Sequence, residues 1–344
     1  MVRYMVIVAL FAFSVSVFAE NEKKEAAASA KAPVKIILDT DIGGDIDDLG
    51  ALAILNVLAD KGECEILAVM SCTARKKAVD AIDVVNTYFG RPDTPVGHHD
   101  GKVSDWEPNY CEFLADSFKH DLKGENAPDA TGLYRKILSA QPDNSVVIIS
   151  IGGLRNLYNL MNSKPDDISS LDGKGLISKK VGRIVTMGGT YPSSGKGAEP
   201  NFQWCGKGYA KFVVDNFPRP QIFSGSEIGL GGYRTGTKLN SLPDESPIKA
   251  GYLYFMKHPP KWAGGPFDRI TEWPTYDQCA VIVGVRGGGE YFEEVKGYNK
   301  IDDDGKNEWQ ASPARDQGYL KEKMKAKTFA DTIIEPLMVT LPKK

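Results

Sequence analysis

Short apolar runs of strand length alternate with longer stretches of helical spacing along most of the chain. The strand-like runs are rich in Val and Ile, and Gly or polar residues mark the turns between them. Four strands are each followed by a helix: strand 34–38 by helix 47–58, strand 66–70 by helix 76–89, strand 146–151 by helix 154–161, and strand 184–187 by helix 208–217. A last strand is predicted over 221–223. This alternation predicts a single α/β domain with a central, mostly parallel, Rossmann-like sheet flanked by helices.

Two later segments depart from that alternation. Residues 258–274 are rich in Pro and Gly, which predicts a long functional loop rather than a linker between domains. Residues 287–317 are rich in Gly and Asp and are expected to be irregular or hairpin-like.

Acidic residues crowd the end of the first predicted strand. Five carboxylates fall within ten residues, directly after one apolar run and directly before another: Asp39, Asp41, Asp45, Asp47 and Asp48. Capping of the following helix accounts for one or two of these acids, because carboxylates favour a first helical turn. Five such acids repel each other unless a cation lies among them, and oxygen ligands on a Gly-containing loop suit calcium first and magnesium second. The sequence therefore predicts a metal site.

Further glycines follow two other predicted strands, at Ile151-Gly152-Gly153 and at Met187-Gly188-Gly189. In open parallel sheets, ligands bind beyond the carboxyl ends of the strands. These segments and the acidic cluster are therefore expected to meet in one pocket.

The first nineteen residues have the pattern of a secretory signal peptide. Arg3 precedes an apolar run over 5–18, and Val17-Phe18-Ala19 is a suitable cleavage site. We expect residues 1–19 to be the signal peptide, 20–33 a solvated tether and 34–344 the folded domain of a periplasmic or secreted protein, with an uncleaved N-terminal anchor as the alternative. No later run is long enough to span a bilayer, so no stable membrane insertion is expected after cleavage.

Composition narrows the function further. The formal net charge is −3, so the chain has no excess of Lys and Arg with which to neutralise phosphates. This speaks against nucleic-acid binding. The five cysteines are odd in number and show no short paired spacing, so they indicate neither a zinc site nor a disulfide framework. A small molecule is the expected partner.

At four segments the chain resembles the nucleoside hydrolases of the inosine–uridine-preferring type, over roughly residues 34 to 285. The acidic stretch 39–48 is a longer form of that family's Asp-x-Asp-Pro-Gly-x-Asp-Asp motif, with Ile42 where Pro is usual. The others are Ile151-Gly152-Gly153-Leu154-Arg155-Asn156, Met187-Gly188-Gly189 followed by Ala198-Glu199-Pro200-Asn201-Phe202, and Tyr276-Asp277-Gln278-Cys279-Ala280-Val281.

The resemblance implies calcium-dependent hydrolysis of the N-glycosidic bond of a nucleoside or other N-riboside, in an enzyme that is a possible homo-oligomer. Its residue pattern implies calcium ligation by Asp41, Asp48, Asp277 and the Ile151 carbonyl, and a general-base role for Asp41. Substrate binding is implied for Asp47, Glu199, Asn201 and Met187. The two-residue insertion leaves open whether Asp45 or Asp47 binds the ribose.

Two positions differ from the family pattern. Tyr276 replaces the His often assigned to protonating the leaving base, and Tyr276, a Trp stacked on the base or His258 could serve instead. Arg75 lies nearest to a sugar-binding Asn of the family. It either binds an anionic group of the substrate or is a solvated residue at a helix start.

Two other functions fit parts of the pattern. A phosphatase of the haloacid-dehalogenase type would use Asp39 as nucleophile and Asp41 as acid/base, but it would leave Glu199 and Asn201 without a role. A non-catalytic, metal-dependent riboside-binding protein would not need three acids retained around a water-activating metal.

Overall fold

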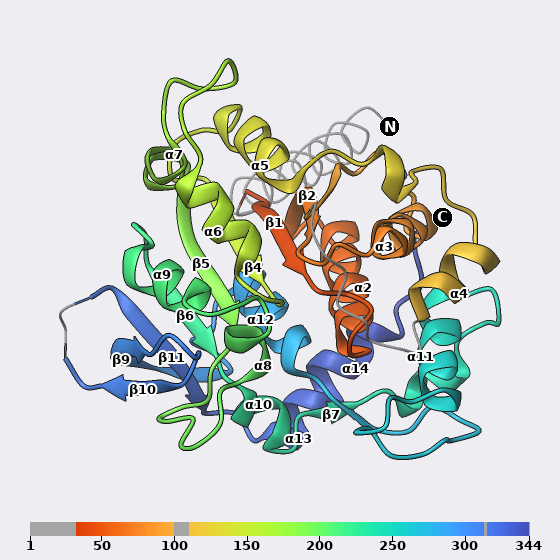
Figure 1. Ribbon diagram of the computed structural model, residues 1–344. Coiled ribbons are helices and arrows are strands. Elements are labelled where there is room, and N and C mark those ends of the chain that lie inside the picture. Colours follow the sequence, from red (N-terminus) through yellow and green to blue (C-terminus); the bar gives the residue numbers. More distant parts are fainter. Residues whose placement is uncertain (1–31, 100–109, 313–314, 344) are drawn as a thin grey trace, which may run out of the picture. The chain divides into compact units, whose positions relative to one another are not determined.

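Parallel strands form the centre of the fold in the computed structural model, which describes residues 32–99, 110–312 and 315–343 (Figure 1). Within these residues, the main sheet has nine strands in the order β10-β9-β11-β6-β5-β4-β1-β2-β3. Their bounds are β1 Val34–Thr40, β2 Cys64–Ser71, β3 Val96–His98, β4 Val146–Ser150, β5 Val181–Met187, β6 Gln221–Ser224, β9 Phe292–Ile301, β10 Asn307–Gln310 and β11 Gln317–Glu322; β7 Arg234–Thr235 and β8 Trp273–Pro274 form a separate pair. The predicted signal peptide, and all but the last two residues of the tether, lie outside the described residues.

Successive strands are added on different sides of β1: β2 and β3 lie on one side, and β4, β5 and β6 lie on the other. β1 pairs in parallel with β2 on one side and with β4 on the other. In open α/β sheets, the point where the strand order reverses is where a crevice opens at the carboxyl ends of the strands. The acidic stretch follows β1 at that crevice.

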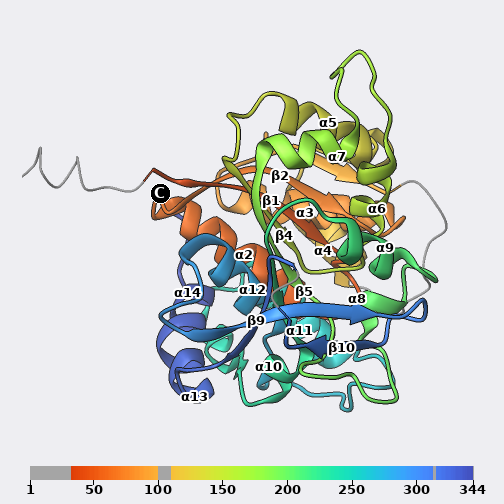
Figure 2. The ribbon, with the colours of Figure 1, turned by 90° about the vertical axis from the view of Figure 1, so that its left-hand side faces the viewer.

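Helices cover both faces of the sheet, as the alternation predicts (Figures 1 and 2). Successive side chains of β1 point to opposite faces, so Ile36 and Leu38 join one buried cluster and Ile37 joins the other. The first cluster includes residues of α2, α3, α4, α11 and α12, and the second includes residues of α5, α6, α7 and α9. The helices are α2 Asp47–Asp60, α3 Lys76–Tyr88, α4 Tyr110–Ser117, α5 Ala130–Ser139, α6 Arg155–Asn162, α7 Gly173–Lys180, α8 Pro200–Gln203, α9 Tyr209–Asn216, α10 Ser226–Leu230, α11 Pro247–Lys257, α12 Tyr276–Arg286, α13 Ala326–Phe329 and α14 Glu335–Met338, with shorter turns η1 Gly124–Asn126, η2 Thr237–Ser241 and η3 Ala330–Ile334.

The fold class is confirmed, and each predicted strand and helix is present with ends that differ by a few residues. The segment expected to be irregular or hairpin-like forms a hairpin of β9 and β10, and its strands extend the main sheet. β11 pairs in parallel with β6, while β9 runs antiparallel to both β11 and β10. The chain thus returns, more than ninety residues after β6, to the same edge of the sheet.

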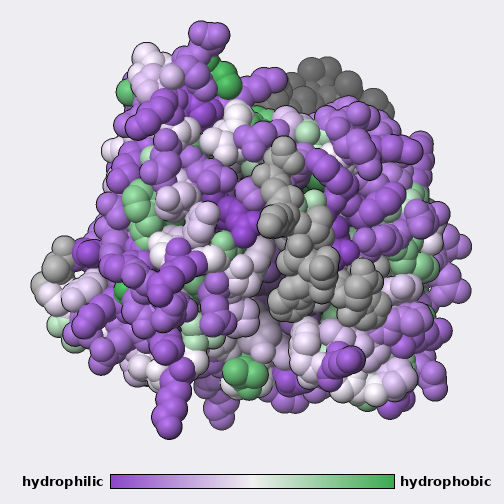
Figure 3. Space-filling view, in the orientation of Figure 1, coloured by the Kyte–Doolittle hydropathy of each residue, from purple (hydrophilic) through white to green (hydrophobic). Residues whose placement is uncertain are grey.

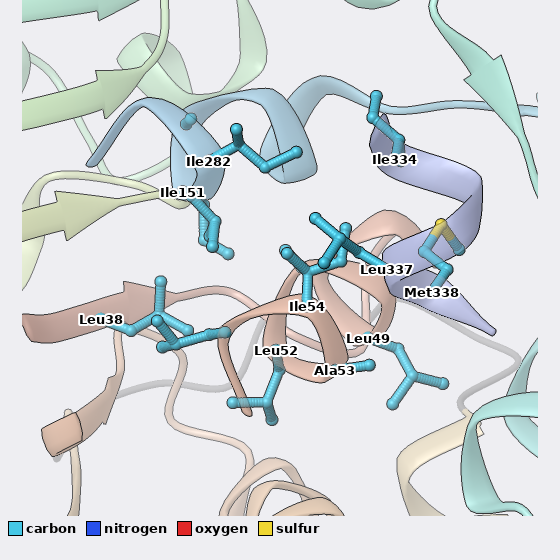
Figure 4. Close-up of a cluster of buried hydrophobic side chains, with 14 of the residues drawn as sticks. Leu38, Leu49, Leu52, Ala53, Ile54, Ile151, Ile282, Ile334, Leu337 and Met338 are labelled. Carbon is cyan, nitrogen blue, oxygen red and sulfur yellow. The ribbon is translucent and has the colours of Figure 1, made fainter. Parts of the chain in front are cut away.

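Helix α2 is buried over most of its length. Leu49, Leu52 and Ile54 are at most 1% exposed, and Figure 4 shows them among side chains of β1, α12 and α14. Burial of a Leu or Ile side chain contributes about 1.5–3 kcal/mol. This packing fixes the position of the first turn of α2, which carries two of the acids.

The surface contrasts with this interior. Most of the face in Figure 3 is hydrophilic, and hydrophobic residues lie on it in small separate patches. All five cysteines are buried, and no disulfide joins any two of them. Among the described residues, no helix combines the length and the apolarity needed to cross a membrane.

Candidate active site

Three buried carboxylates meet where the first turns of α2 and α12 lie together. Asp47 and Asp48 begin α2, Asp277 is the second residue of α12, and candidate ligand atoms of the three acids lie within 4.8 Å of one another. The backbone N–H of Asp277 donates to Asp47 Oδ2 at 3.2 Å, and the Thr40 hydroxyl donates to Asp48. Burial raises the pKa of each of these acids well above its usual value, and repulsion between neighbouring acids raises it further.

Asp41 and Ile151 line the same pocket, beyond the ends of β1 and β4. Burial raises the pKa of Asp41 to about 7, and the charge of Asp45 adds to the effect. The charge of Asp41 in turn raises the pKa values of Asp48 and Asp277. Asp41 therefore lies outside the set of three close carboxylates, but its charge still acts on two of them.

This donor set fits a hard divalent cation. The donors are all oxygens, and each of the three close carboxylates is at most 3% exposed. Buried like charges at this spacing are unfavourable in ionised form unless a cation offsets them. The resemblance assigns Asp41 to the metal and Asp47 to the sugar, whereas the geometry groups Asp47 with Asp48 and Asp277.

Asp45 occupies a different environment from Asp47. Its Oδ1 accepts hydrogen bonds of 2.6 Å from Trp273 Nε1 and from the backbone N–H of Ile46. Burial raises the pKa of Asp45 to about 6. One oxygen of Asp45 is thus engaged by the protein, although the residue lines the pocket.

Glu199 and Asn201 line the same pocket as the acids that follow β1 and begin α2. Glu199 Oε2 accepts a hydrogen bond from the Gly189 N–H at 3.0 Å, and Oε1 accepts one from the Asn201 N–H at 3.1 Å. Burial raises the pKa of Glu199 to about 7. Asn201 Nδ2 lies 3.3 Å from the Met187 carbonyl and 3.4 Å from the Ile151 carbonyl, so it ties the ends of β5 and β4 together. Met187 also lines the pocket.

The pocket has a volume of about 540 Å³, and apolar side chains line it beside the acids. Trp204, Met187 and Tyr276 lie along its walls. Two further lining residues are strongly exposed, Leu230 at 66% and Trp262 at 56%. Trp262 comes from the loop over 258–274, so that loop does contribute to the pocket. The combination suits a ligand with one polar, hydroxyl-rich part and one flat, apolar part.

Tyr276 and Arg75 both line the pocket. Burial and the charge of Asp47 raise the pKa of Tyr276 above its usual value, so its hydroxyl stays protonated. Arg75 is 9% exposed, and its Nη1 lies 3.1 Å from Glu112 Oε1. His258 is exposed, with Nδ1 3.0 Å from the Tyr254 carbonyl oxygen, and it is not among the residues that line the pocket.

Asp39 is separate from the pocket. It is 1% exposed and accepts hydrogen bonds from the Tyr134 hydroxyl at 2.9 Å and from Asn156 Nδ2 at 3.0 Å. A phosphatase nucleophile at this position would need to face the substrate. Asp39 instead anchors α5 and α6 to β1.

A close pair of hydroxyls in the pocket was not identified from the sequence. Thr190 Oγ1 and Ser226 Oγ lie 2.6 Å apart, and both residues line the pocket. Each follows a parallel strand, β5 or β6, by a few residues. The rule that points to Asp41 and Ile151 would have found them, had the positions after each strand been searched for hydroxyls as well as for acids and glycines.

The sequence matches one protein family, described as inosine-uridine preferring nucleoside hydrolase, over residues 36–333. Among solved structures, a plant nucleoside hydrolase, PpNRh1, is similar at 16% identity and a TM-score of 0.64, over 90% of this chain and 99% of that one. The type III effector protein XopQ, solved in complex with adenosine diphosphate ribose, is similar at 13% identity and a TM-score of 0.61, over 93% of this chain and 97% of that one. The effector protein XOO4466 is similar at 12% identity and a TM-score of 0.63, with the same coverage. No curated protein matches the sequence.

Proposed function

The chain belongs to the inosine–uridine preferring nucleoside hydrolase family and is a hydrolase acting on N-glycosyl bonds, and from this premise we propose that it cleaves ribonucleosides with calcium bound in its acidic cluster. The observation that carries the proposal is the placement of Asp47, Asp48 and Asp277 in one pocket with Glu199 and Asn201. Oxygen donors for a cation and polar groups for ribose hydroxyls thus face a common volume.

The proposed calcium ligands are Asp41, Asp48, Asp277 and the Ile151 carbonyl, with Asp47 close enough to share the site. When bound, the cation offsets the negative charge of the cluster and acidifies water in the pocket. Magnesium is the weaker candidate, because it requires smaller and more regular coordination.

The reaction requires a general base, hydrogen bonds that hold the sugar, and stabilisation of the leaving nucleobase. Asp41 takes a proton from a water molecule as the water oxygen bonds to C1′ of the ribose. The C1′–N bond breaks through an oxocarbenium-like transition state, and the base leaves with the electron pair of that bond. Glu199, Asn201 and one of Asp45 and Asp47 hold ribose hydroxyls. Asp45 Oδ1 accepts two hydrogen bonds of 2.6 Å, whereas Asp47 accepts a single longer one of 3.2 Å from the Asp277 N–H, so Asp47 is the assignment we prefer.

The apolar side of the pocket is proposed to receive the base. Trp204 and Trp262 offer flat faces for stacking. Arg75 is the proposed contact for substrates that carry a phosphate or carboxylate. The expected alternative of a solvated residue is wrong, because Arg75 is buried and pairs with Glu112; the alternative is a structural role at the start of α3.

A non-catalytic riboside-binding protein is the second candidate. It is favoured by Tyr276, which stands where the family commonly has the His assigned to protonating the leaving base. For location, we propose export after cleavage between Ala19 and Glu20, which the mass of the mature N-terminus would test. An exported enzyme of this type would serve nucleoside scavenging outside the cytoplasm.

The test is release of ribose from a panel of neutral purine and pyrimidine nucleosides and anionic ribosides, by residues 20–344. The panel is run with calcium, with magnesium and with a chelator. We expect calcium-dependent hydrolysis, with a loss of at least about 100-fold in Asp41→Ala. Asp143→Ala, which removes an exposed carboxylate from an ion pair with Lys180, is the matched control and should keep wild-type activity.

Silence across the panel, with calcium still raising the unfolding temperature, would favour the binding protein. Activity that survives Asp41→Ala would remove Asp41 from the general-base role. A preference for anionic ribosides that disappears in Arg75→Ala would assign Arg75 to substrate binding, and equal use of neutral and anionic ribosides would leave it a residue of the helix start.

A further inference from the structure

The loop over 188–199, between β5 and α8, forms one wall of the pocket. Thr190, Gly197, Ala198 and Glu199 of this loop line the cavity. No helix or strand is assigned within it, so contacts from elsewhere must fix its shape. These contacts come from α10, where the Ser226 N–H donates to the Gly189 carbonyl and Glu227 accepts from the Tyr191 N–H, each at 2.9 Å, and from the β9–β10 hairpin, the part of the chain about which the sequence was least informative.

Asn307, the first residue of β10, holds the backbone of Thr190 at both polar atoms. Its Oδ1 accepts a hydrogen bond from the Thr190 N–H at 3.0 Å, and its Nδ2 donates to the Thr190 carbonyl at 2.9 Å. The side chain is 3% exposed, and the two residues are 117 positions apart in the sequence. A buried amide side chain that hydrogen-bonds both the N–H and the C=O of one residue fixes the orientation of that residue and also adds stability.

The backbone of the hairpin holds the rest of the loop. The Ser194 N–H donates to the Asn307 carbonyl at 2.9 Å, and the Trp309 N–H donates to the Pro192 carbonyl at 2.8 Å. These bonds do not depend on the side chain at position 307. Substitution of Asn307 is therefore expected to release the Thr190 segment while leaving the hairpin paired.

The contact continues from Thr190 to the sugar-binding residues. The N–H of Gly189, adjacent to Thr190, donates to Glu199 Oε2, and the Thr190 hydroxyl lies 2.6 Å from that of Ser226. We propose that Asn307 is a positioning residue, which holds the Thr190 and Glu199 wall in its substrate-binding arrangement and so sets the affinity for the ribose. The proposal rests on the proposed function, because it assumes that this wall contacts a riboside.

The first test compares the steady-state kinetics of Asn307→Ala with those of the wild type. Because the wall would bind the sugar in both the ground state and the transition state, we expect KM to rise at least about tenfold while kcat changes less than about threefold. Asn56→Ala is the matched control. Asn56 is a fully buried Asn of α2 whose Nδ2 donates to the Leu52 carbonyl and to Asn86, each at 3.1 Å, and it does not line the pocket. It should lower the unfolding temperature without changing KM.

The second test measures the position of the loop without any substrate. Lys196 is exposed in the same loop, and trypsin cleavage between Lys196 and Gly197 can be followed by mass spectrometry. We expect cleavage at least about tenfold faster in Asn307→Ala than in the wild type or in Asn56→Ala. Asn307→Asp keeps the acceptor for the Thr190 N–H and loses the donor to its carbonyl, so it should change in the same direction and serves if Asn307→Ala does not fold.

An unchanged cleavage rate would overturn the proposal whatever the kinetics. So would a fall in kcat with KM unchanged, since Asn307 would then act on the chemical step. If the wild type hydrolyses no riboside, the proposed function fails, and the cleavage rate alone decides whether Asn307 positions the loop.

Discussion

Tyr276 illustrates how one side chain can change the way in which a site treats its leaving group. A hydroxyl whose pKa is raised by burial keeps its proton at neutral pH. It can therefore donate a hydrogen bond to a departing base, but it is a poor source of a full proton. We therefore propose that Tyr276 stabilises negative charge on the departing base.

Replacing Tyr276 with Phe keeps the ring and removes the hydroxyl. We expect kcat for nucleosides to fall about tenfold, the value of one hydrogen bond to a developing charge. For p-nitrophenyl riboside we expect little change, because p-nitrophenolate departs without needing a proton. An equal fall for both substrates would show that the hydroxyl serves some other step.

The three close acids are brought together by the packing of two helices. α2 and α12 lie against each other, so that residues 230 positions apart in the sequence share one cluster. Gly50 permits this approach, because a Cβ at this position would lie 2.5 Å from the Tyr252 hydroxyl and 2.6 Å from Gln278 Nε2. Both of those side chains are fully buried and have little room to move.

Gly50→Ala should therefore push α2 away from α11 and α12. We expect a loss of about 1–3 kcal/mol in the free energy of unfolding, together with weaker calcium binding, both measured by denaturant titration with and without calcium. Gly132→Ala on α5 is the control, since its Cβ would meet only Asp129 Oδ2 at 4.0 Å. It should leave stability unchanged or raise it by about 0.5–1 kcal/mol. Wild-type stability in Gly50→Ala would contradict the packing argument.

Several buried carboxyl groups make the stability of the metal-free protein depend on pH. Burial raises the pKa values of Asp39, Asp41 and Glu199 to about 7, while the same groups in an unfolded chain titrate near about pH 4. Between about pH 4 and pH 7, the folded protein therefore binds more protons than the unfolded chain. Its stability falls as the pH rises through that window.

We expect the unfolding temperature in chelator to be higher at about pH 5.5 than at about pH 8. Saturating calcium should weaken or reverse this trend, because the ligands bind the cation in their ionised form. Differential scanning fluorimetry at both pH values, with chelator and with calcium, measures the effect. An unfolding temperature in chelator that rises with pH would contradict the assignment of raised pKa values.

The sequence predicts those parts of the fold whose signals are local. The strand at Val34–Thr40 and the helix at Asp47–Asp60 are clear because apolar periodicity changes sharply at the acidic turn. The pairing of β11 with β6 is not predictable in this way, since Gly and Asp break the pattern and the partner is distant. In the site, the carboxyl-end rule indicates Asp41 and Ile151. Asp277 enters only through resemblance to a family, because no local signal shows which helix end faces α2.

The hydrogen bonds between Asn307 and Thr190 link two parts of the pocket to distant parts of the sequence. The acids that follow β1 and begin α2 come from the start of the domain, whereas the loop at Thr190 is held by a hairpin near its end. On the proposed role of Asn307, variation in the hairpin would change how tightly the substrate is held while the acids keep their positions. Substrate affinity could then evolve independently of the chemical step.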